Sequence, residues 1–217
     1  MTQVPNALVA DLGRAKRIDQ LLAAIDEHDH YTGGHSCRVA AQAGLLARLI
    51  GLDDRTVERV KAAGLVHDIG KVHIQRHILR KRSELTECEL AQMKMHPITG
   101  AAMLSYIPGM EELAPIVLHH HERWDGQGYP TGVSGIDIPL ESRIIFVADA
   151  FDAMTTARSY GDIVGTRLAI EEIDRCAGWQ FDPSVAHAIK LAYDKKWLEP
   201  NGIEDRIPAV DIPRHPY

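Results

Sequence analysis

The residues of this chain that could do chemistry are histidines and aspartates spaced about one helix apart. His67 and Asp68 stand side by side after an apolar run, and the series also includes His35, His96, His119–His121 and Asp149. Each gap is roughly one helix plus one turn, so successive side chains can converge inside a helical bundle. Imidazole and carboxylate together suit divalent Fe, Mn, Zn or Ni. Asp68 is the candidate bridge between two ions, because a carboxylate has two oxygens.

Helical phase sorts the histidine run and places the last aspartate. If the preceding helix continues through the run, His120 shares a face with its apolar residues, and His121 adjoins that face. His119 then points elsewhere, as an outer neighbour. Asp149 follows apolar residues by one turn and is expected to point into the core, where an unpaired carboxylate is costly. These phases predict His120, His121 and Asp149 as inward ligands.

Each of these residues also has a simpler interpretation. A single inward histidine is more often a hydrogen-bonded core residue than a ligand. An isolated His-Asp pair carries little information. The ordered set favours a metal centre, because few stable cores hold so many ionisable groups without an ion.

Composition excludes several classes of protein. The 217 residues are 45% apolar and 25% charged, with a net charge of −6, which argues against a surface for a nucleic-acid polymer. Three distant cysteines make a disulfide framework improbable and fit a reducing cytoplasm. No signal pattern appears, and no apolar run is long enough to cross a membrane.

Apolar spacing predicts an all-α domain around the predicted ligands. Helices are expected near residues 18–25, from 39 to Gly51, from Asp53 or Asp54 to 68, over 83–97 with a kink or restart at Pro97, from 113 to about 121, and over 141–157, 165–178 and 182–198. A glycine-rich loop fills 124–140. The expected organisation is an N-terminal tail over 1–16, a catalytic domain over 17–198 and a proline-rich tail over 199–217.

Several motifs resemble those of the HD-GYP family, within the HD superfamily of metal-dependent phosphohydrolases. They are HSCRVA, HDIGK, HPITGA, HHERWDGQGYP, SRIIFVADAFDAMTTARSY and AGWQFDP, in that order over about residues 17–197. The resemblance implies an HD-domain helical bundle around two or three metal ions. It also implies hydrolysis of cyclic di-GMP to pGpG, with further hydrolysis to GMP left open.

The resemblance carries functional residues to particular positions. The implied metal ligands are His35, His67, Asp68, His96, His120, His121 and Asp149. With Asp68 as the bridge, we expect His35, His67 and Asp149 beside one ion and His96, His120 and His121 beside the other. Lys71 matches a lysine near the substrate phosphate, where its charge would stabilise the reaction. Arg158 and Tyr160 match substrate contacts.

Three departures from the family pattern affect what is expected. Tyr31 stands where members with three metals carry a glutamate, which favours two ions, with Fe or Mn preferred over Zn or Ni. The usual GKIGIPD reads GKVHIQR, and the usual KPG reads KRS at residues 81–83. These last two changes put substrate preference in question more than metal binding.

The loop around the Gly-Tyr-Pro motif leaves alternatives open. Arg123 and Asp125 could orient histidines or pair with each other on the surface. Gly126 and Gly128 allow close backbone approach, and Tyr129, before Pro130, offers either a flat face for guanine or a packing anchor. Asp152 could be a site acid or a surface charge, and Arg38 is expected in a structural ion pair.

Three functions are therefore compared. The first is a cytoplasmic cyclic di-GMP phosphodiesterase that uses two divalent ions. The second keeps the metals but acts on another cyclic dinucleotide or nucleotide. The third is a non-catalytic module that binds cyclic di-GMP or docks a cyclase domain or sensor protein through residues 128–130. The sequence leaves open the oligomeric state and whether the chain is a fragment of a larger sensor protein.

Overall fold

The structure is a computed structural model that describes residues 6–28, 34–156 and 165–198. Within these ranges every regular element is helical, which confirms the expected all-α class. The α-helices are α1 (Asn6–His28), α2 (His35–Ile50), α3 (Asp54–Val66), α4 (Arg76–Leu79), α5 (Glu87–Met93), α6 (His96–Ser105), α7 (Ala114–Leu118), α8 (Leu140–Thr155), α9 (Thr166–Arg175) and α10 (Pro183–Asp194). Three short 3-10 helices complete the order: η2 (Ile69–His73), η3 (Glu111–Leu113) and η4 (Gly135–Asp137).

Local sequence signals set several helix ends. Gly51 ends α2 in the left-handed region, with φ of 90°, as its position predicted. The Asp53 carboxylate accepts a hydrogen bond from the Thr56 N–H at 2.8 Å and caps α3. Thr86 and Glu89 form a capping box at the start of α5. A new helix starts at His96 with Pro97 in its first turn, so the expected restart is confirmed.

Several predicted helix ends are wrong. The helix expected over 83–97 is α5, which covers only Glu87–Met93 before α6 begins. The first helix begins at Asn6, so residues 6–16, assigned above to an N-terminal tail, are helical. This stretch contains three alanines, two leucines, one arginine and one lysine, and these residues propagate a helix without a strong apolar stripe. Helix α7 ends at Leu118, and residues 119–121 form a turn rather than a last helical turn.

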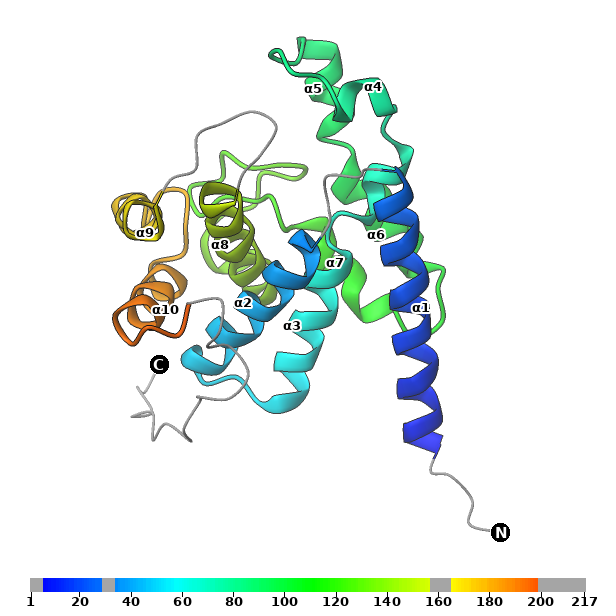
Figure 1. The fold of residues 1–217 in the computed structure, drawn as a ribbon, viewed down its shortest axis with the longest axis horizontal. Helices are drawn as coiled ribbons and strands as arrows, with labels where there is room; N and C mark the ends of the chain where they lie inside the picture. Colours follow the sequence, from blue (N-terminus) through cyan, green and yellow to red (C-terminus); the bar gives the residue numbers. More distant parts are fainter. Residues whose placement is uncertain (1–5, 29–33, 157–164, 199–217) are drawn as a thin grey trace.

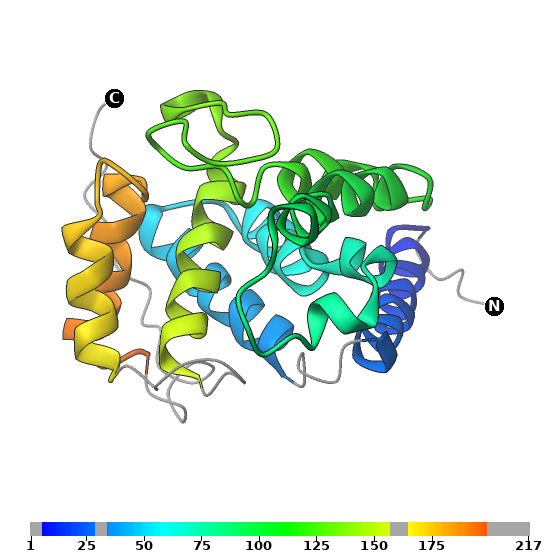
Figure 2. The ribbon, with the colours of Figure 1, turned by 90° about the horizontal axis from the view of Figure 1, so that it is seen from above.

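The helices are arranged around a centre formed by α2, α3 and α8. Helix α2 packs against both α3 and α8, and α7 contacts α3 and α8. Helix α1 lies on one side of this centre and α9 and α10 on the other (Figures 1 and 2). Helices α4 and α5 project at the upper edge in Figure 1. The region that positions the expected ligands is therefore enclosed by helices from distant parts of the chain.

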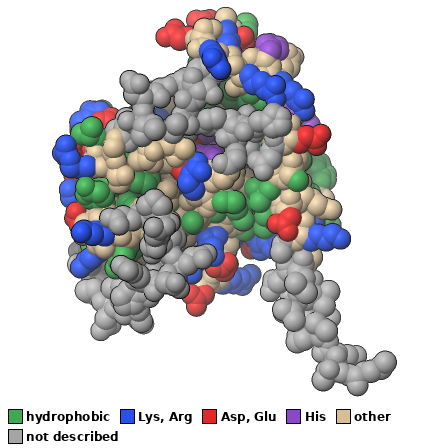
Figure 3. All heavy atoms as spheres, viewed as in Figure 1, with side chains coloured by type: hydrophobic (Ala, Val, Ile, Leu, Met, Phe, Trp, Pro, Cys, Tyr) green, Lys and Arg blue, Asp and Glu red, His purple; other side chains and the backbone are tan. Residues whose placement is uncertain are grey.

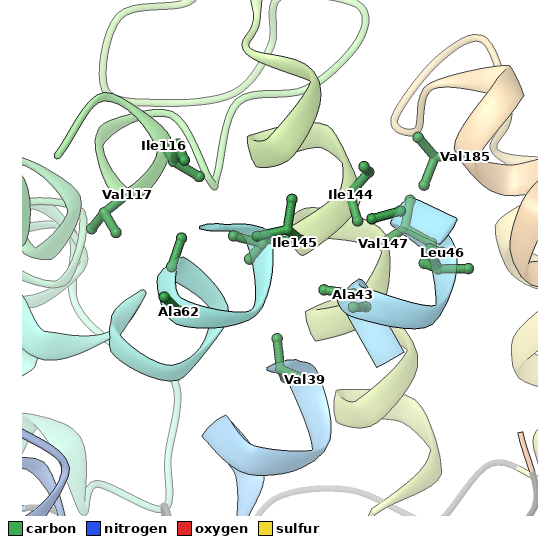
Figure 4. Close-up of a cluster of buried hydrophobic side chains, with 14 of the residues drawn as sticks. Val39, Ala43, Leu46, Ala62, Ile116, Val117, Ile144, Ile145, Val147 and Val185 are labelled. Atoms are coloured by element: carbon green, nitrogen blue, oxygen red, sulfur yellow. The ribbon is translucent and has the colours of Figure 1, made fainter. Parts of the chain in front are cut away.

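One apolar core holds the central helices together. Figure 4 shows side chains of α2 facing side chains of α8, with α3, α7 and α10 contributing at the borders. The labelled residues are Val39, Ala43, Leu46, Ala62, Ile116, Val117, Ile144, Ile145, Val147 and Val185. Ile144, Ile145 and Val147 are fully buried, so α8 is an interior helix, as the apolar spacing predicted.

Other features of the described ranges agree with the composition. Cys37, Cys88 and Cys176 are all free, as their spacing predicted. Among the described helices, none combines the length and the apolar character that a membrane span needs. Figure 3 shows lysine, arginine and acidic side chains together over the α4 and α5 region, above a more apolar middle.

Candidate metal centre

The predicted ligands meet because helix ends converge. His35 is the first residue of α2, His67 caps the end of α3, and Asp68 follows it. His96 opens α6, and His120 and His121 lie in the turn after α7. Residues at helix ends can aim side chains along the axis of the bundle rather than only outward from it. The structure thus brings together side chains that are more than one hundred residues apart in sequence.

These side chains form two groups that share one carboxylate. Asp68, His96, His120 and His121 make one group, and His35, His67 and Asp68 make the other. Within each group the candidate ligand atoms all lie within 4.8 Å of one another. Asp149 adjoins the second group, with Oδ1 3.4 Å from Nε2 of His35. The division on either side of Asp68 is the one that the sequence suggested.

Backbone hydrogen bonds fix which nitrogen each buried histidine presents. In three rings Nδ1 lies within hydrogen-bond distance of the carbonyl oxygen three residues earlier: 2.7 Å for His67 to Gly64, 2.8 Å for His96 to Met93 and 2.6 Å for His120 to Val117. A carbonyl oxygen only accepts, so Nδ1 must carry the proton. In a neutral ring, Nε2 then presents a lone pair to the centre.

The atoms that face the centre are therefore mostly hydrogen-bond acceptors, and they lie close to one another. Nε2 of His96 lies 3.2 Å from Nε2 of His120 and 3.3 Å from Oδ1 of Asp68. Nε2 of His67 and Oδ1 of Asp68 are buried without a hydrogen-bond partner among the described residues. Such an arrangement is repulsive unless a cation lies among the lone pairs. The side chains present fit divalent metal ions.

The electrostatics of the site favour the neutral form of three imidazoles, those of His96, His120 and His121. Burial lowers the pKa of His96 to about 4 and that of His121 to about 3, and it also holds the pKa of His120 well below its usual value. Burial acts to raise the pKa of Asp68, but Lys71 and then His67 outweigh it and hold that pKa well below its usual value. Neutral imidazoles around an ionised carboxylate are the protonation states that metal ligands require.

Asp152 orients the first histidine. Its carboxylate is buried, lies 2.7 Å from Nδ1 of His35, and accepts a 2.6 Å hydrogen bond from Nε of Arg38. Nε2 of His35 is thereby turned toward Asp149 and Asp68. Asp152 is thus neither a surface charge nor a ligand: it fixes the orientation of His35 from behind, as carboxylates do behind metal-bound histidines. Arg38 forms the structural ion pair that was expected.

The HDIGK segment is held tightly against α6. Lys71 Nζ lies 2.6 Å from Oδ2 of Asp68, so the lysine predicted near the phosphate borders the shared carboxylate. A Cβ at Gly70 would lie 2.0 Å from the carbonyl oxygen of His96, and only glycine fits there. The Gly70 position therefore sets the distance between Asp68 and His96.

The loop that carries Gly-Tyr-Pro packs on the histidine turn. A Cβ at Gly128 would lie 2.3 Å from the Arg123 nitrogen, which explains the glycine. The Tyr129 ring stacks on His121 with centroids 4.9 Å apart, and Pro130 follows through a cis peptide bond. Burial first, and then the charges of Asp68 and Asp149, raise the pKa of Tyr129. Tyr129 therefore borders the centre and acts as a packing anchor.

Other residues of this loop make contacts away from the ligands. Arg123 donates to Asp125 at 2.7 Å and 3.0 Å and to Gln180 at 3.2 Å. Among the described contacts, neither charged side chain bonds a histidine of the centre, so they pair with each other, which was one of the two alternatives. Gly126 lies in a turn with φ of 77°.

Sequence reasoning missed Glu122, which fastens this loop. Its carboxylate is 1% exposed and accepts from the Thr131 N–H at 2.6 Å, the Thr131 hydroxyl at 2.7 Å and the Gly132 N–H at 3.1 Å. An acid placed between an apolar run and a glycine-rich loop was the available signal. The groups that donate to Glu122 lie nine and ten residues later in the loop, so its sequence position alone did not reveal the contact.

The remaining predicted residues lie away from the two ligand groups or outside the described ranges. His119 lies outside both ligand groups, with Nδ1 2.8 Å from the Pro115 carbonyl oxygen, in agreement with its predicted outer position. Tyr31, Arg158 and Tyr160 lie outside the described residues.

Comparison with known families identifies the fold. The sequence pattern that defines the HD domain matches residues 19–185. The chain belongs to the HD domain family. The resemblance stated from the motifs is thereby confirmed.

Several characterised proteins are similar to this HD domain. The cyclic di-GMP phosphodiesterase response regulator RpfG of Xanthomonas campestris pv. campestris is 38% identical over 174 residues, which are 79% of this chain and 46% of that protein. The 3'3'-cGAMP-specific phosphodiesterase 2 of Vibrio cholerae is 34% identical over 192 residues, 87% of this chain and 37% of that protein. This HD domain thus spans less than half the length of these relatives.

A solved structure supports the fold independently. A cyclic GMP-AMP specific phosphodiesterase of Vibrio cholerae, V-cGAP3, superposes with a TM-score of 0.62 at 19% identity, covering 83% of this chain and 49% of that one. At this identity the likeness establishes the HD-domain fold.

Proposed function

We propose that this HD domain, over about residues 17–198, is an HD-GYP phosphodiesterase that hydrolyses cyclic di-GMP to pGpG with two divalent metal ions. The observation that carries the proposal is the pair of ligand groups that share Asp68. Two adjacent ions would lower the pKa of water and neutralise the charge of a phosphodiester, and these are the two difficulties of this hydrolysis. The similarity to named cyclic di-GMP phosphodiesterases supports the choice of substrate.

The residues of the chain have separate tasks in this proposal. Asp68 would be shared by two ions, held by His35, His67 and Asp149 on one side and by His96, His120 and His121 on the other. The backbone carbonyl oxygens behind His67, His96 and His120 would keep each Nε2 free to bind an ion. Lys71, half-buried beside Asp68, places a fixed positive charge where phosphate charge develops. Arg158 and Tyr160 are proposed to contact the substrate.

Ligand chemistry guides the choice of metal. Mixed imidazole and carboxylate ligands accept Fe, Mn, Zn or Ni, and we propose Fe or Mn as the resident ions. Two ions, rather than three, follow from Tyr31 in place of a glutamate. A cytoplasmic location is proposed with this choice, since three free cysteines and oxidisable ions suit a reducing compartment.

A second candidate substrate is 3'3'-cGAMP. Relatives named for that substrate are 34% to 39% identical to this chain. The altered residues 73–76 follow the metal-binding segment, and the altered residues 81–83 come after α4. Neither set contains a predicted ligand, so a change of substrate preference there need not affect metal binding. Binding of a cyclase domain or sensor protein at residues 128–130 stays a prediction. The packing of Tyr129 on His121 lies within this chain and does not require such a partner.

The test is turnover by the metal-loaded protein. The protein is reconstituted without oxygen with Fe, Mn, Zn or Ni and incubated with cyclic di-GMP, 3'3'-cGAMP and cyclic di-AMP, and products are separated by chromatography. The proposal expects cyclic di-GMP to be consumed fastest, with pGpG as the first product. Faster turnover of 3'3'-cGAMP would make that dinucleotide the assigned substrate. Tight binding without product would indicate a non-catalytic module.

A variant ties that turnover to the proposed centre. Asp68→Ala should abolish hydrolysis and lose at least one ion while its far-ultraviolet circular dichroism stays helical. Unreduced turnover by this variant would overturn the mechanism.

A further inference from the structure

Lys94 occupies a particular place beside the metal centre. It caps the end of α5, two residues before His96, and its side chain is exposed. Its Nζ lies over the Tyr129 ring, 5.4 Å from the centroid, and that ring stacks on His121 at 4.9 Å. The Tyr129 ring therefore contacts both the Lys94 ammonium and a predicted ligand.

The charge of Lys94 is left available by its surroundings. Lys61, Lys81 and Lys190 each pair with an acidic side chain. Among the described residues, Lys94 has no acidic partner, and its contact is the face of an aromatic ring. A cation over a ring keeps its attraction for an anion, because the ring contributes only a partial negative charge.

The neighbouring segment strengthens the same field. Residues 71–82 read KVHIQRHILRKR, with five lysines and arginines and no acidic residue, in a chain of net charge −6. Within this segment the Arg80 and Arg82 side chains are exposed. Figure 3 shows lysine and arginine side chains over α4 and α5, together with acidic side chains. A positive edge next to a metal site attracts an anionic substrate and orients it before reaction.

From this placement, and resting on the proposed function, we propose that Lys94, held over Tyr129, binds the second phosphate of a cyclic dinucleotide while the first lies at the metals beside Lys71. An ammonium is a compact charge with three donors and suits a phosphate oxygen. A guanine is a poorer occupant of this place, because His121 and Lys94 already engage the Tyr129 ring. The site thus selects substrates that carry two phosphates.

The test compares substrates with two phosphates and with one. Lys94→Met removes the charge and keeps a long apolar chain, and Lys94→Arg restores the charge. Lys190→Met, at an exposed lysine of α10, is the matched control. KM and kcat are measured with cyclic di-GMP and 3'3'-cGAMP, and with bis(p-nitrophenyl) phosphate, which has a single phosphate.

The proposal expects a KM split. Lys94→Met should raise KM for both dinucleotides about tenfold and leave kcat unchanged, since one charge-assisted contact is lost. The kcat/KM of Lys94→Met for bis(p-nitrophenyl) phosphate should stay within about twofold of wild type. Lys94→Arg should recover the wild-type KM for the dinucleotides. Added salt should raise the dinucleotide KM of the wild-type protein more than that of Lys94→Met.

Two results overturn the proposal in different ways. If dinucleotides are hydrolysed and Lys94→Met leaves their KM unchanged, or lowers turnover of both substrate types equally, the inference is wrong and the proposed function stands. If the wild-type protein hydrolyses bis(p-nitrophenyl) phosphate and no cyclic dinucleotide, the proposed function is wrong, and the inference falls with it.

Discussion

Gly70 offers a direct test of how the fold sets the metal centre. In Gly70→Ala the new Cβ would lie 2.0 Å from the His96 carbonyl oxygen, 2.6 Å from Thr99 Oγ1 and 2.7 Å from the Gly100 nitrogen. Two of these atoms are backbone and cannot rotate away. Because real Cβ contacts stay above 3.0 Å, η2 and α6 would have to separate by about 1 Å. Overpacking in a rigid site costs about 3 kcal/mol or somewhat more.

Two measurements check this expectation. Urea unfolding of the metal-free protein should show a loss of about 3 kcal/mol in the free energy of unfolding. Elemental analysis of the loaded protein should show less than the wild-type metal content, because His96 moves away from Asp68. Gly13→Ala, in α1, is the control: its Cβ would lie 3.4 Å from the flexible end of Arg17, and alanine should stabilise the helix by about 0.5–1 kcal/mol. Wild-type stability together with full metal content in Gly70→Ala would refute the reasoning.

Three further predictions concern the supporting residues. Glu122→Ala leaves three loop donors without an acceptor and should lower the free energy of unfolding by about 3–5 kcal/mol in urea titrations. The control is Glu84→Ala, at an exposed position, and an equal loss of stability in that variant would contradict the prediction. Asp152→Ala releases His35 and should weaken metal binding about 10- to 100-fold in competition with a chelator, and unchanged affinity would count against the orienting role. Burial holds the folded pKa of His96 at about 4, below its ordinary 6.5, so the unfolded chain takes up the proton first as pH falls. The free energy of unfolding of the metal-free protein should therefore fall by on the order of 3 kcal/mol between pH 6.5 and pH 4. A wild-type free energy of unfolding that does not change over this pH range, with the same pH dependence in His96→Gln, would contradict this prediction.

The sequence predicted the parts of the centre that depend on local order. His67 and His96 mark the end of one helix and the start of another, and apolar spacing, Asp53 and Pro97 locate those helices without tertiary information. The spacing of one ligand per helix then predicts convergence, because consecutive helices in a bundle pack side by side.

What the sequence could not supply depends on contacts between distant segments. Asp152 meets His35 across 117 positions, and Glu122 needs the loop that returns to it. The histidine turn was placed by helical phase, although α7 ends at Leu118. His120 and His121 still belong to one ligand group, and His120 Nδ1 is held by the Val117 carbonyl oxygen.

The central claim is that two divalent ions lie on either side of Asp68. The most direct measurement is anomalous diffraction from crystals of the Mn- or Fe-loaded protein, collected on both sides of the absorption edge of that metal. The account predicts two anomalous peaks, one among His35, His67 and Asp149 and one among His96, His120 and His121, with an Asp68 oxygen bound to each. A single peak on one side of Asp68, or none within the cluster, would contradict it.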